Sequence, residues 1–125
     1  MELTFADESI DLIITSDILE HVRHPERAWA ETHRVLRPGG KHIFSIPVKW
    51  PMPPETIRRV DVSGPEDVLL LDAHHHRGHL VYNDFGADLL DDLRGIGFEA
   101  DIHRYVTSDP ITARLCTFVA TKAVR

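Results

Sequence analysis

The stretch that decides the fold is residues 10–17, which read IDLIITSD. The apolar, β-branched run from Ile10 to Ile14 predicts a short buried strand, and its near-continuous apolarity is typical of a parallel strand covered on both faces. Ser16 and Asp17 are residue types that cap helix N-termini, so we expect a short helical turn over residues 18–22.

The next segment completes a strand–helix–strand unit. Pro25 suits the first position of a helix, and apolar residues then recur at helical spacing as far as Leu36. The Pro-Gly-Gly run at 38–40 ends that helix and allows the chain to reverse, so we expect the next strand at 41–47. Such short connections predict a right-handed crossover between parallel strands.

The second half of the chain begins with an irregular region at residues 48–80. Its run WPMPP at 50–54 cannot form a regular helix or a central strand. A connection of this length in a small domain is usually a functional or a disordered loop.

A further helix is expected after this region, capped by Asn83 or Asp84 and stopped by Gly95. Its apolar stripe, from Phe85 to Ile96, indicates a face that packs on the core. The last two strands are expected at 98–106 and 115–122, joined around residues 108–110.

Three separated motifs occur in the first forty residues: FADESIDLI at 5–13, LEHV at 19–22 and RVLRPGG at 34–40. In this order they resemble the class I S-adenosylmethionine-dependent methyltransferases of the small-molecule, type 11-like kind. Residues 84–98 also look like that family's late helix. The resemblance implies an α/β, partial Rossmann-like fold of about four strands in the order 1-2-4-3. The strands would be mostly parallel, with the last one antiparallel and with flanking helices.

The resemblance is to the C-terminal half of that family's domain. Family members hold the methyl donor against a glycine-rich loop and an acidic residue, because glycines let backbone amides approach a ligand. No G-x-G-x-x-G follows an early strand here. We therefore expect residues 1–125 to form a single methyltransferase-like domain that lacks the N-terminal donor-binding half.

The amino-acid composition limits which binding partners and which cellular compartment we expect. The chain carries 14 basic and 20 acidic residues, a net charge of −6, which argues against nucleic acid or an anionic membrane as a partner. Its single cysteine, Cys116, excludes an internal disulfide and fits a reducing compartment. No apolar run is long enough to span a bilayer, so we expect a cytoplasmic protein.

The first candidate site follows the first predicted strand. Thr15, Ser16 and Asp17 stand at its carboxyl end, where open α/β sheets bind ligands. The resemblance implies that these residues contact the donor, S-adenosylmethionine. His21 is the candidate catalytic residue, acting as a general base, because histidine titrates near neutral pH.

Asp17, Glu20 and His21 also form a candidate divalent metal site. On a helical turn these positions share one face, so two carboxylates and an imidazole could converge on one cation. The set resembles the Glu-x-x-Glu-His stretch of metal-assisted O-methyltransferases. The alternative is that Asp17 caps the turn while Glu20 and His21 shape the pocket wall.

Other candidates lie in the irregular region. Trp50, Met52 and His79 are candidate substrate-side residues, with the first two as lid residues; the alternative is that both pack the loop on the body. Histidines are dense at 74–76, but neighbouring residues point in different directions, so at most two of the three would face one ion. Arg58 and Arg59 could pair with an acidic substrate group, or be solvated.

Two functions follow from these observations. In the first, the chain is an S-adenosylmethionine-dependent methyltransferase acting on a small molecule, incomplete as an isolated chain. In the second, it is a non-catalytic interaction module, or it needs a partner chain to complete the site. The unpaired edge of the first strand predicts a homodimer or higher assembly, because such edges seek partners.

Overall fold

A four-stranded sheet forms the centre of the molecule in the computed structural model, which describes residues 2–104, 107–109 and 116–124. The strands are β1 (Ile10–Ser16), β2 (Leu36–Ser45), β9 (Phe98–Arg104) and β10 (Cys116–Lys122). Their order is β1-β2-β10-β9, and β10 is antiparallel to both of its neighbours while β1 and β2 are parallel. The predicted order 1-2-4-3 is confirmed.

Parts of the last two predicted strands, at 105–106 and at 115, lie outside the described residues, as does position 110 of the predicted turn. Within the described residues, β9 and β10 pair in full, from Arg104 opposite Cys116 to Phe98 opposite Lys122.

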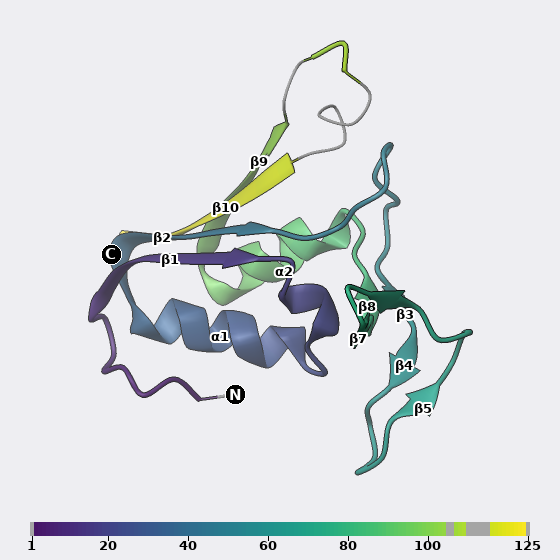
Figure 1. Ribbon diagram of the computed structural model, residues 1–125. Coiled ribbons are helices and arrows are strands. Elements are labelled where there is room, and N and C mark those ends of the chain that lie inside the picture. The colour runs from purple at the N-terminus through teal and green to yellow at the C-terminus, as the bar shows by residue number, and fades with distance from the viewer. Residues whose placement is uncertain (1, 105–106, 110–115, 125) are drawn as a thin grey trace.

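Two helices, α1 (Pro25–Val35) and α2 (Asp88–Ile96), cover the same side of the sheet (Figure 1). In the core between the sheet and the helices, the rings of Phe44 on β2 and Phe118 on β10 stack with centroids 5.1 Å apart. Both phenylalanines are almost fully buried, so this pair marks the centre of the hydrophobic core. Among the described residues, no helix combines the length and apolarity that crossing a membrane requires.

Several predicted element boundaries are wrong. Strand β2 begins at Leu36 instead of residue 41, because the chain leaves α1 in extended conformation there and the positive φ of Gly39 (80°) lets it run on. Helix α2 begins at Asp88, not after Asn83 or Asp84, and it continues through Gly95. It ends at Gly97, whose φ of 118° is the left-handed conformation that terminates helices.

The other side of the sheet carries apolar side chains that the helices do not cover. Leu12 and Ile14, on β1, are 49% and 69% exposed, and Ile18 just beyond the strand is 50% exposed. The expectation of a parallel strand buried on both faces therefore fails for the described residues, because both helices pack against the opposite face.

Residues 46–84, which we call the loop segment, connect β2 to α2 and contain strands of only two residues each. They pair as three ladders: β3 (Ile57–Arg58) with β8 (Asn83–Asp84), β4 (Val60–Asp61) with β5 (Val68–Leu69), and β6 (His75–His76) with β7 (His79–Leu80). Figure 1 shows this segment extending beyond the carboxyl ends of β1 and β2.

Polar contacts hold the loop segment to itself, to helix α2 and to Arg23 before helix α1. Arg59 donates to the Asp84 carboxylate at 2.9 Å, and the hydroxyl of Thr56 donates to Asp88 on α2 at 2.6 Å. At the far end, Arg23 donates to the Asp67 carboxylate at 2.7 Å. These contacts place the loop segment across the end of the sheet where the candidate residues lie.

Candidate functional site

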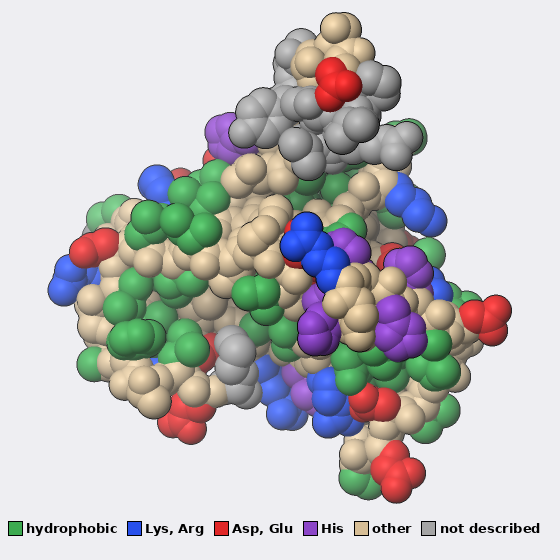
Figure 2. All heavy atoms as spheres, in the orientation of Figure 1, with side chains coloured by type: hydrophobic (Ala, Val, Ile, Leu, Met, Phe, Trp, Pro, Cys, Tyr) green, Lys and Arg blue, Asp and Glu red, His purple; other side chains and the backbone are tan. Residues whose placement is uncertain are grey.

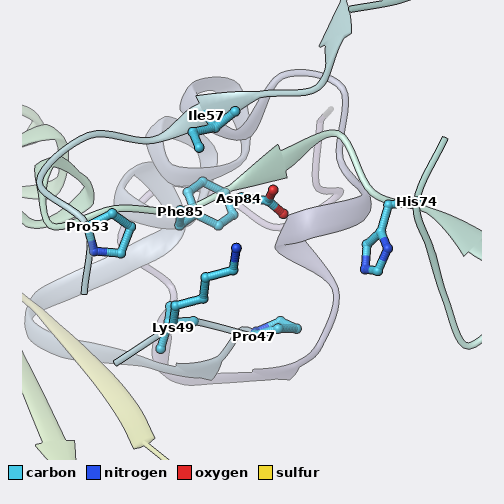
Figure 3. Close-up of a pocket in the computed structure, with 8 residues that line it drawn as sticks. Pro47, Lys49, Pro53, Ile57, His74, Asp84 and Phe85 are labelled. Atoms are coloured by element: carbon cyan, nitrogen blue, oxygen red, sulfur yellow. The ribbon is translucent and has the colours of Figure 1, made fainter. Parts of the chain in front are cut away.

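A cavity of about 270 Å³ opens beside the carboxyl end of β2. Pro47, Ile57 and Phe85 give it apolar walls, and Lys49 and Asp84 add opposite charges. Figure 3 shows the Lys49 amino group pointing into the space beside Phe85 and Asp84. Open α/β sheets bind ligands beyond the carboxyl ends of their strands, so the cavity lies where the fold favours a site.

A second cavity, of about 80 Å³, adjoins the first and shares Pro47, His74 and Asp84 with it. Glu20 and His76 also line it. Acidic, imidazole and apolar groups therefore meet at one place, which is typical of small-molecule sites.

Glu20 is the most deeply buried charged group of this region, with 2% exposure. Its Oε1 atom lies 3.3 Å from His21 Nε2 and 3.3 Å from His76 Nδ1. Its Oε2 atom is buried without a hydrogen-bond partner in the described structure. A carboxylate that is buried and half satisfied is costly, which makes Glu20 the chemically notable residue of the site.

Local backbone structure brings this cluster together. Glu20 and His21 lie on a single helical turn, η1 (Leu19–His21), directly after β1, and the Tyr82 amide donates to the Glu20 carbonyl at 2.8 Å. His76 is carried by the hairpin β6–β7, whose two turn residues, Arg77 and Gly78, both have positive φ (52° and 82°). Two positive φ angles characterise the tight turn that suits strand twist.

The three predicted donor-binding residues lie at the carboxyl end of β1, with Thr15 and Ser16 inside the strand and Asp17 just after it, but they have separate contacts. The Thr15 hydroxyl lies 2.9 Å from Nε2 of the buried His42, and Ser16 Oγ is exposed and 3.0 Å from Ser45 Oγ. Asp17 has a φ of 51°, and its carboxylate lies 3.9 Å from the Arg77 guanidinium.

The predicted metal set is brought together only in part. Glu20 and His21 are neighbours, but Asp17 faces Arg77, and the third ligand-type group in reach is His76 from the loop segment. Of the histidine run at 74–76, only His76 contacts Glu20 among the described contacts.

The predicted substrate-side residues divide into two groups. Trp50 and Met52 are half-buried and pack against the hydrophobic core, and the Arg104 guanidinium lies 3.7 Å from the Trp50 ring centroid. His79 is exposed, with its ring centroid 5.6 Å from that of His21. Neither Trp50 nor Met52 lines the two cavities. Of the two arginines, Arg59 pairs with Asp84, at the edge of both cavities.

His42, next to the candidate site, has a strongly shifted pKa. It is fully buried, and burial lowers its pKa from the ordinary 6.5 to about 4. Its Nε2 atom meets Thr15, and its Nδ1 atom has no partner in the described structure. The imidazole therefore stays neutral at physiological pH, and it links β2 to the end of β1 as a hydrogen-bonding group.

Sequence reasoning did not assign site roles to Lys49, Asp84 or, individually, His76. A signal for His76 was present, because the Arg77-Gly78 pair between two histidines is a plausible tight hairpin turn that sets His76 opposite His79. No such signal exists in the sequence for Lys49 and Asp84, because these two residues meet at the larger cavity only through the way the loop segment folds back.

Comparisons with known proteins agree on one family. A family model of the methyltransferase domain matches residues 1–44. An uncharacterized methyltransferase of Mycobacterium avium is 34% identical over 93 residues, which are 73% of this chain and 36% of that protein. One from Mycolicibacterium vanbaalenii is 35% identical over 70% of this chain and 34% of its own length. In these alignments the chain spans about a third of its relatives' length.

Solved structures show the same fold. An S-adenosylmethionine-dependent methyltransferase from Mesorhizobium loti superposes with a TM-score of 0.63 and 19% identity, over 96% of this chain and 65% of that one. A 1,6-didemethyltoxoflavin-N1-methyltransferase from Burkholderia thailandensis, solved with 1,6-didemethyltoxoflavin and S-adenosylhomocysteine bound, gives a TM-score of 0.55 and 18% identity. That match covers 94% of this chain and 46% of the other.

Proposed function

Because the chain belongs to the class I S-adenosylmethionine-dependent methyltransferase family, we propose that it serves methyl transfer to a small molecule. The observation that carries the proposal is the pair of adjoining cavities at the carboxyl ends of β1 and β2. Their combined volume suits a compact substrate, and their walls mix apolar surface with Lys49, Glu20 and Asp84.

The described residues fit one side of a donor site. The exposed Ser16 hydroxyl and the backbone bend at Asp17 offer polar contacts, and the exposed Ile14 and Ile18 offer apolar ones. Gly86, two residues before α2, does not cradle a ligand, because a Cβ there would meet the Glu55 backbone at 2.4 Å. When bound, S-adenosylmethionine supplies the methyl group.

The residues around Glu20 would act on the substrate. Leu80 accepts a hydrogen bond from His21 Nδ1 at 2.8 Å, which fixes the ring and leaves Nε2 facing Glu20. We assign His21, with Glu20 and His76, the role of accepting a proton from a substrate hydroxyl or amine. Glu20 and His76 line the smaller cavity, so they present this basic cluster to the substrate.

Calorimetric titration of the purified chain with S-adenosylhomocysteine tests the proposal. We expect saturable binding at micromolar ligand, weakened several-fold by Asp17→Ala. Ser108→Ala, an exposed change away from the candidate site, is the matched control and should leave the affinity unchanged. Absence of heat at millimolar ligand would contradict donor binding by this chain.

A second candidate function is association through the uncovered side of the sheet. Leu12, Ile14 and Ile18 are exposed large apolar residues on or beside β1, and β1 has only one neighbouring strand among the described residues. Figure 2 shows hydrophobic side chains at several places over the part of the molecule where β1 runs. We propose that a second copy of the chain covers this surface.

Analytical ultracentrifugation tests this self-association by measuring the size of the chain in solution. We expect a dimer or larger species that Ile14→Asp converts to a monomer, with Val124→Asp, another exposed apolar site, as the control. A monodisperse monomer well above micromolar concentration would rule the assembly out.

A further inference from the structure

We propose that Glu20, His21 and His76 form a binding site for a divalent transition metal of the zinc class. The three residues come from two separate parts of the chain, the turn η1 after β1 and the hairpin β6–β7. Each offers one ligand atom, and the three atoms lie within 4.8 Å of one another. The metal site rests on this geometry alone, and only its role in catalysis rests on the proposed function.

The spacing of the ligand atoms fits a tetrahedral ion. Zinc–nitrogen and zinc–oxygen bonds of about 2.0–2.1 Å at tetrahedral angles separate neighbouring ligand atoms by roughly 3.3–3.4 Å. Glu20 Oε1 lies 3.3 Å from His21 Nε2 and 3.3 Å from His76 Nδ1. Two of the three ligand separations therefore already have the required length, and the third changes with a small movement of the hairpin.

The protonation pattern of His21 calls for a positive charge at this position. The Leu80 carbonyl can only accept a hydrogen bond, so the Nδ1 atom 2.8 Å away carries the proton. In the neutral ring, the Nε2 lone pair then faces the Glu20 carboxylate at 3.3 Å. Two acceptors oppose each other unless a proton or a metal ion lies between them. A backbone carbonyl behind the distal nitrogen is also the usual support of a metal-bound histidine.

The second oxygen of Glu20 supports the same conclusion independently. Among the described residues, Oε2 is buried without a hydrogen-bond partner, in a side chain that is 2% exposed. Leaving a buried carboxylate oxygen unpaired is unfavourable, and a metal held by this carboxylate would compensate its charge. Glu20 also lines the smaller cavity, which gives a cation a route to the carboxylate.

The ligand types select the metal. Two imidazoles and one carboxylate suit Zn²⁺, Co²⁺ or Ni²⁺, whereas Mg²⁺ prefers oxygen ligands alone. Asp17, which would have added a second carboxylate, is placed beside Arg77 instead. His79, with its ring 5.6 Å from that of His21, stands next to the cluster. Figure 2 shows histidine side chains gathered on this flank of the molecule.

Three protein ligands leave the fourth tetrahedral position for water or substrate, the arrangement of catalytic rather than structural zinc sites. The smaller cavity adjoins this position, since Glu20 and His76 line it. In methyl transfer, a substrate hydroxyl bound there would lose its proton more readily, because a metal lowers the pKa of a coordinated oxygen. In this metal-bound form Glu20, His21 and His76 are ligands instead of proton acceptors, so the proton would pass to solvent and the oxygen would become the nucleophile.

Titration of the purified, tag-free chain with Co²⁺, followed by visible absorption, tests the site without any methyl donor. We expect one equivalent to bind with an absorption band stronger than that of the aqueous ion, and Zn²⁺ to displace it. His76→Ala should weaken binding at least tenfold, and Glu20→Gln should do the same while keeping the side-chain shape. His75→Ala, on the same hairpin but exposed, is the matched control and should change the affinity less than twofold.

Either of two outcomes would overturn the proposal. One is a Co²⁺ spectrum that stays that of the aqueous ion. The other is binding that survives His76→Ala but disappears when His74 and His75 are replaced, which would indicate adventitious capture by the exposed histidines. Titration of the unsubstituted chain with S-adenosylhomocysteine separates the two proposals, because donor binding without specific Co²⁺ binding would contradict only the metal site.

Discussion

The sheet with its two helices and the loop segment at 46–84 are built in different ways. In the first, large apolar side chains such as Phe44, Phe118 and Leu89 are almost completely buried, and strands of seven to ten residues form long ladders, with one register shift between β1 and β2. In the second, strands of two residues alternate with turns, and Arg59, Asp67 and Asp84 supply ion pairs and hydrogen bonds. The first region carries the stability, and the second positions His76, His74 and Asp84 at the site.

The candidate chemistry therefore depends on the loop segment, the less stable of the two regions. Glu20 stands on the sheet side, but His76 and the cavity walls come from the loop segment. Changes in the core should therefore unfold the whole molecule, while changes in the loop segment should alter the site and leave the core intact.

The largest expected effect is in the core. Phe118→Ala should reduce the free energy of unfolding by about 3–5 kcal/mol, because it removes a fully buried ring that stacks on Phe44. Urea denaturation followed by circular dichroism measures this. Ile57→Ala, which truncates a 48% exposed side chain of the loop segment, is the matched control and should cost well under 1 kcal/mol. Equal losses in both variants would contradict the division into two regions.

The next effect concerns pH. His42 stays neutral in the native state down to about pH 4, while the unfolded chain protonates it near pH 6.5. The unfolded state thus binds the extra proton, so stability falls as pH decreases from about 6.5 to 4, by up to about 3 kcal/mol in total. His42→Leu should flatten this dependence in urea denaturation at pH 7, 6 and 5.

His75→Ala, the replacement of an exposed histidine, should keep the wild-type dependence. If His42→Leu showed the same loss of stability with falling pH as the wild type, His42 would not be the titrating group.

A smaller effect is expected within the loop segment. Arg59 donates to Asp84 at 2.9 Å in a half-buried pair, so a double-mutant cycle with Arg59→Leu and Asp84→Asn should give a coupling of about 1 kcal/mol. Hydrogen exchange should show faster opening of residues 57–84 in Arg59→Leu with unchanged protection of β2 and β10. Loss of protection in those strands as well would show that the two regions unfold together.

The smallest effect is at the tip of the loop segment. The Tyr82 hydroxyl donates to the Asp67 carboxylate, which lowers the pKa of Asp67. Tyr82→Phe should therefore raise that pKa toward its ordinary value, as measured by NMR titration of the carboxyl group, and lower the midpoint of unfolding at neutral pH only slightly. An unchanged pKa of Asp67 would mean that this contact is not maintained in solution.

The sheet could be predicted well from the sequence, because the apolar periodicity and the three family motifs extend along whole strands and helices. The order 1-2-4-3 and the helix beginning at Pro25 follow from these signals. The boundary errors occur where single residues decide: the helix continues through Gly95 and ends at Gly97, whose φ is positive. The two-sided burial expected for β1 is a different error, because the two helices cover only one face of the sheet among the described residues.

The candidate site could be predicted only in part. Glu20 and His21 share one turn, so their proximity is local and readable from spacing. His76 lies 56 positions from Glu20 and reaches it through a hairpin and the Tyr82–Glu20 backbone bond, and no periodic pattern encodes such a contact. Asp17 failed to join the cluster because its positive φ and Arg77 direct its carboxylate elsewhere.

The most direct test of the central claim, that the carboxyl ends of β1 and β2 form a ligand site, is NMR mapping of the ¹⁵N-labelled chain with S-adenosylhomocysteine. We expect saturable amide shifts at residues 15–21 and at the residues on either side of Pro47, with none at the far end of the sheet around Gly39 and Lys122. Shifts centred on that far end, or no shifts at millimolar ligand, would contradict it.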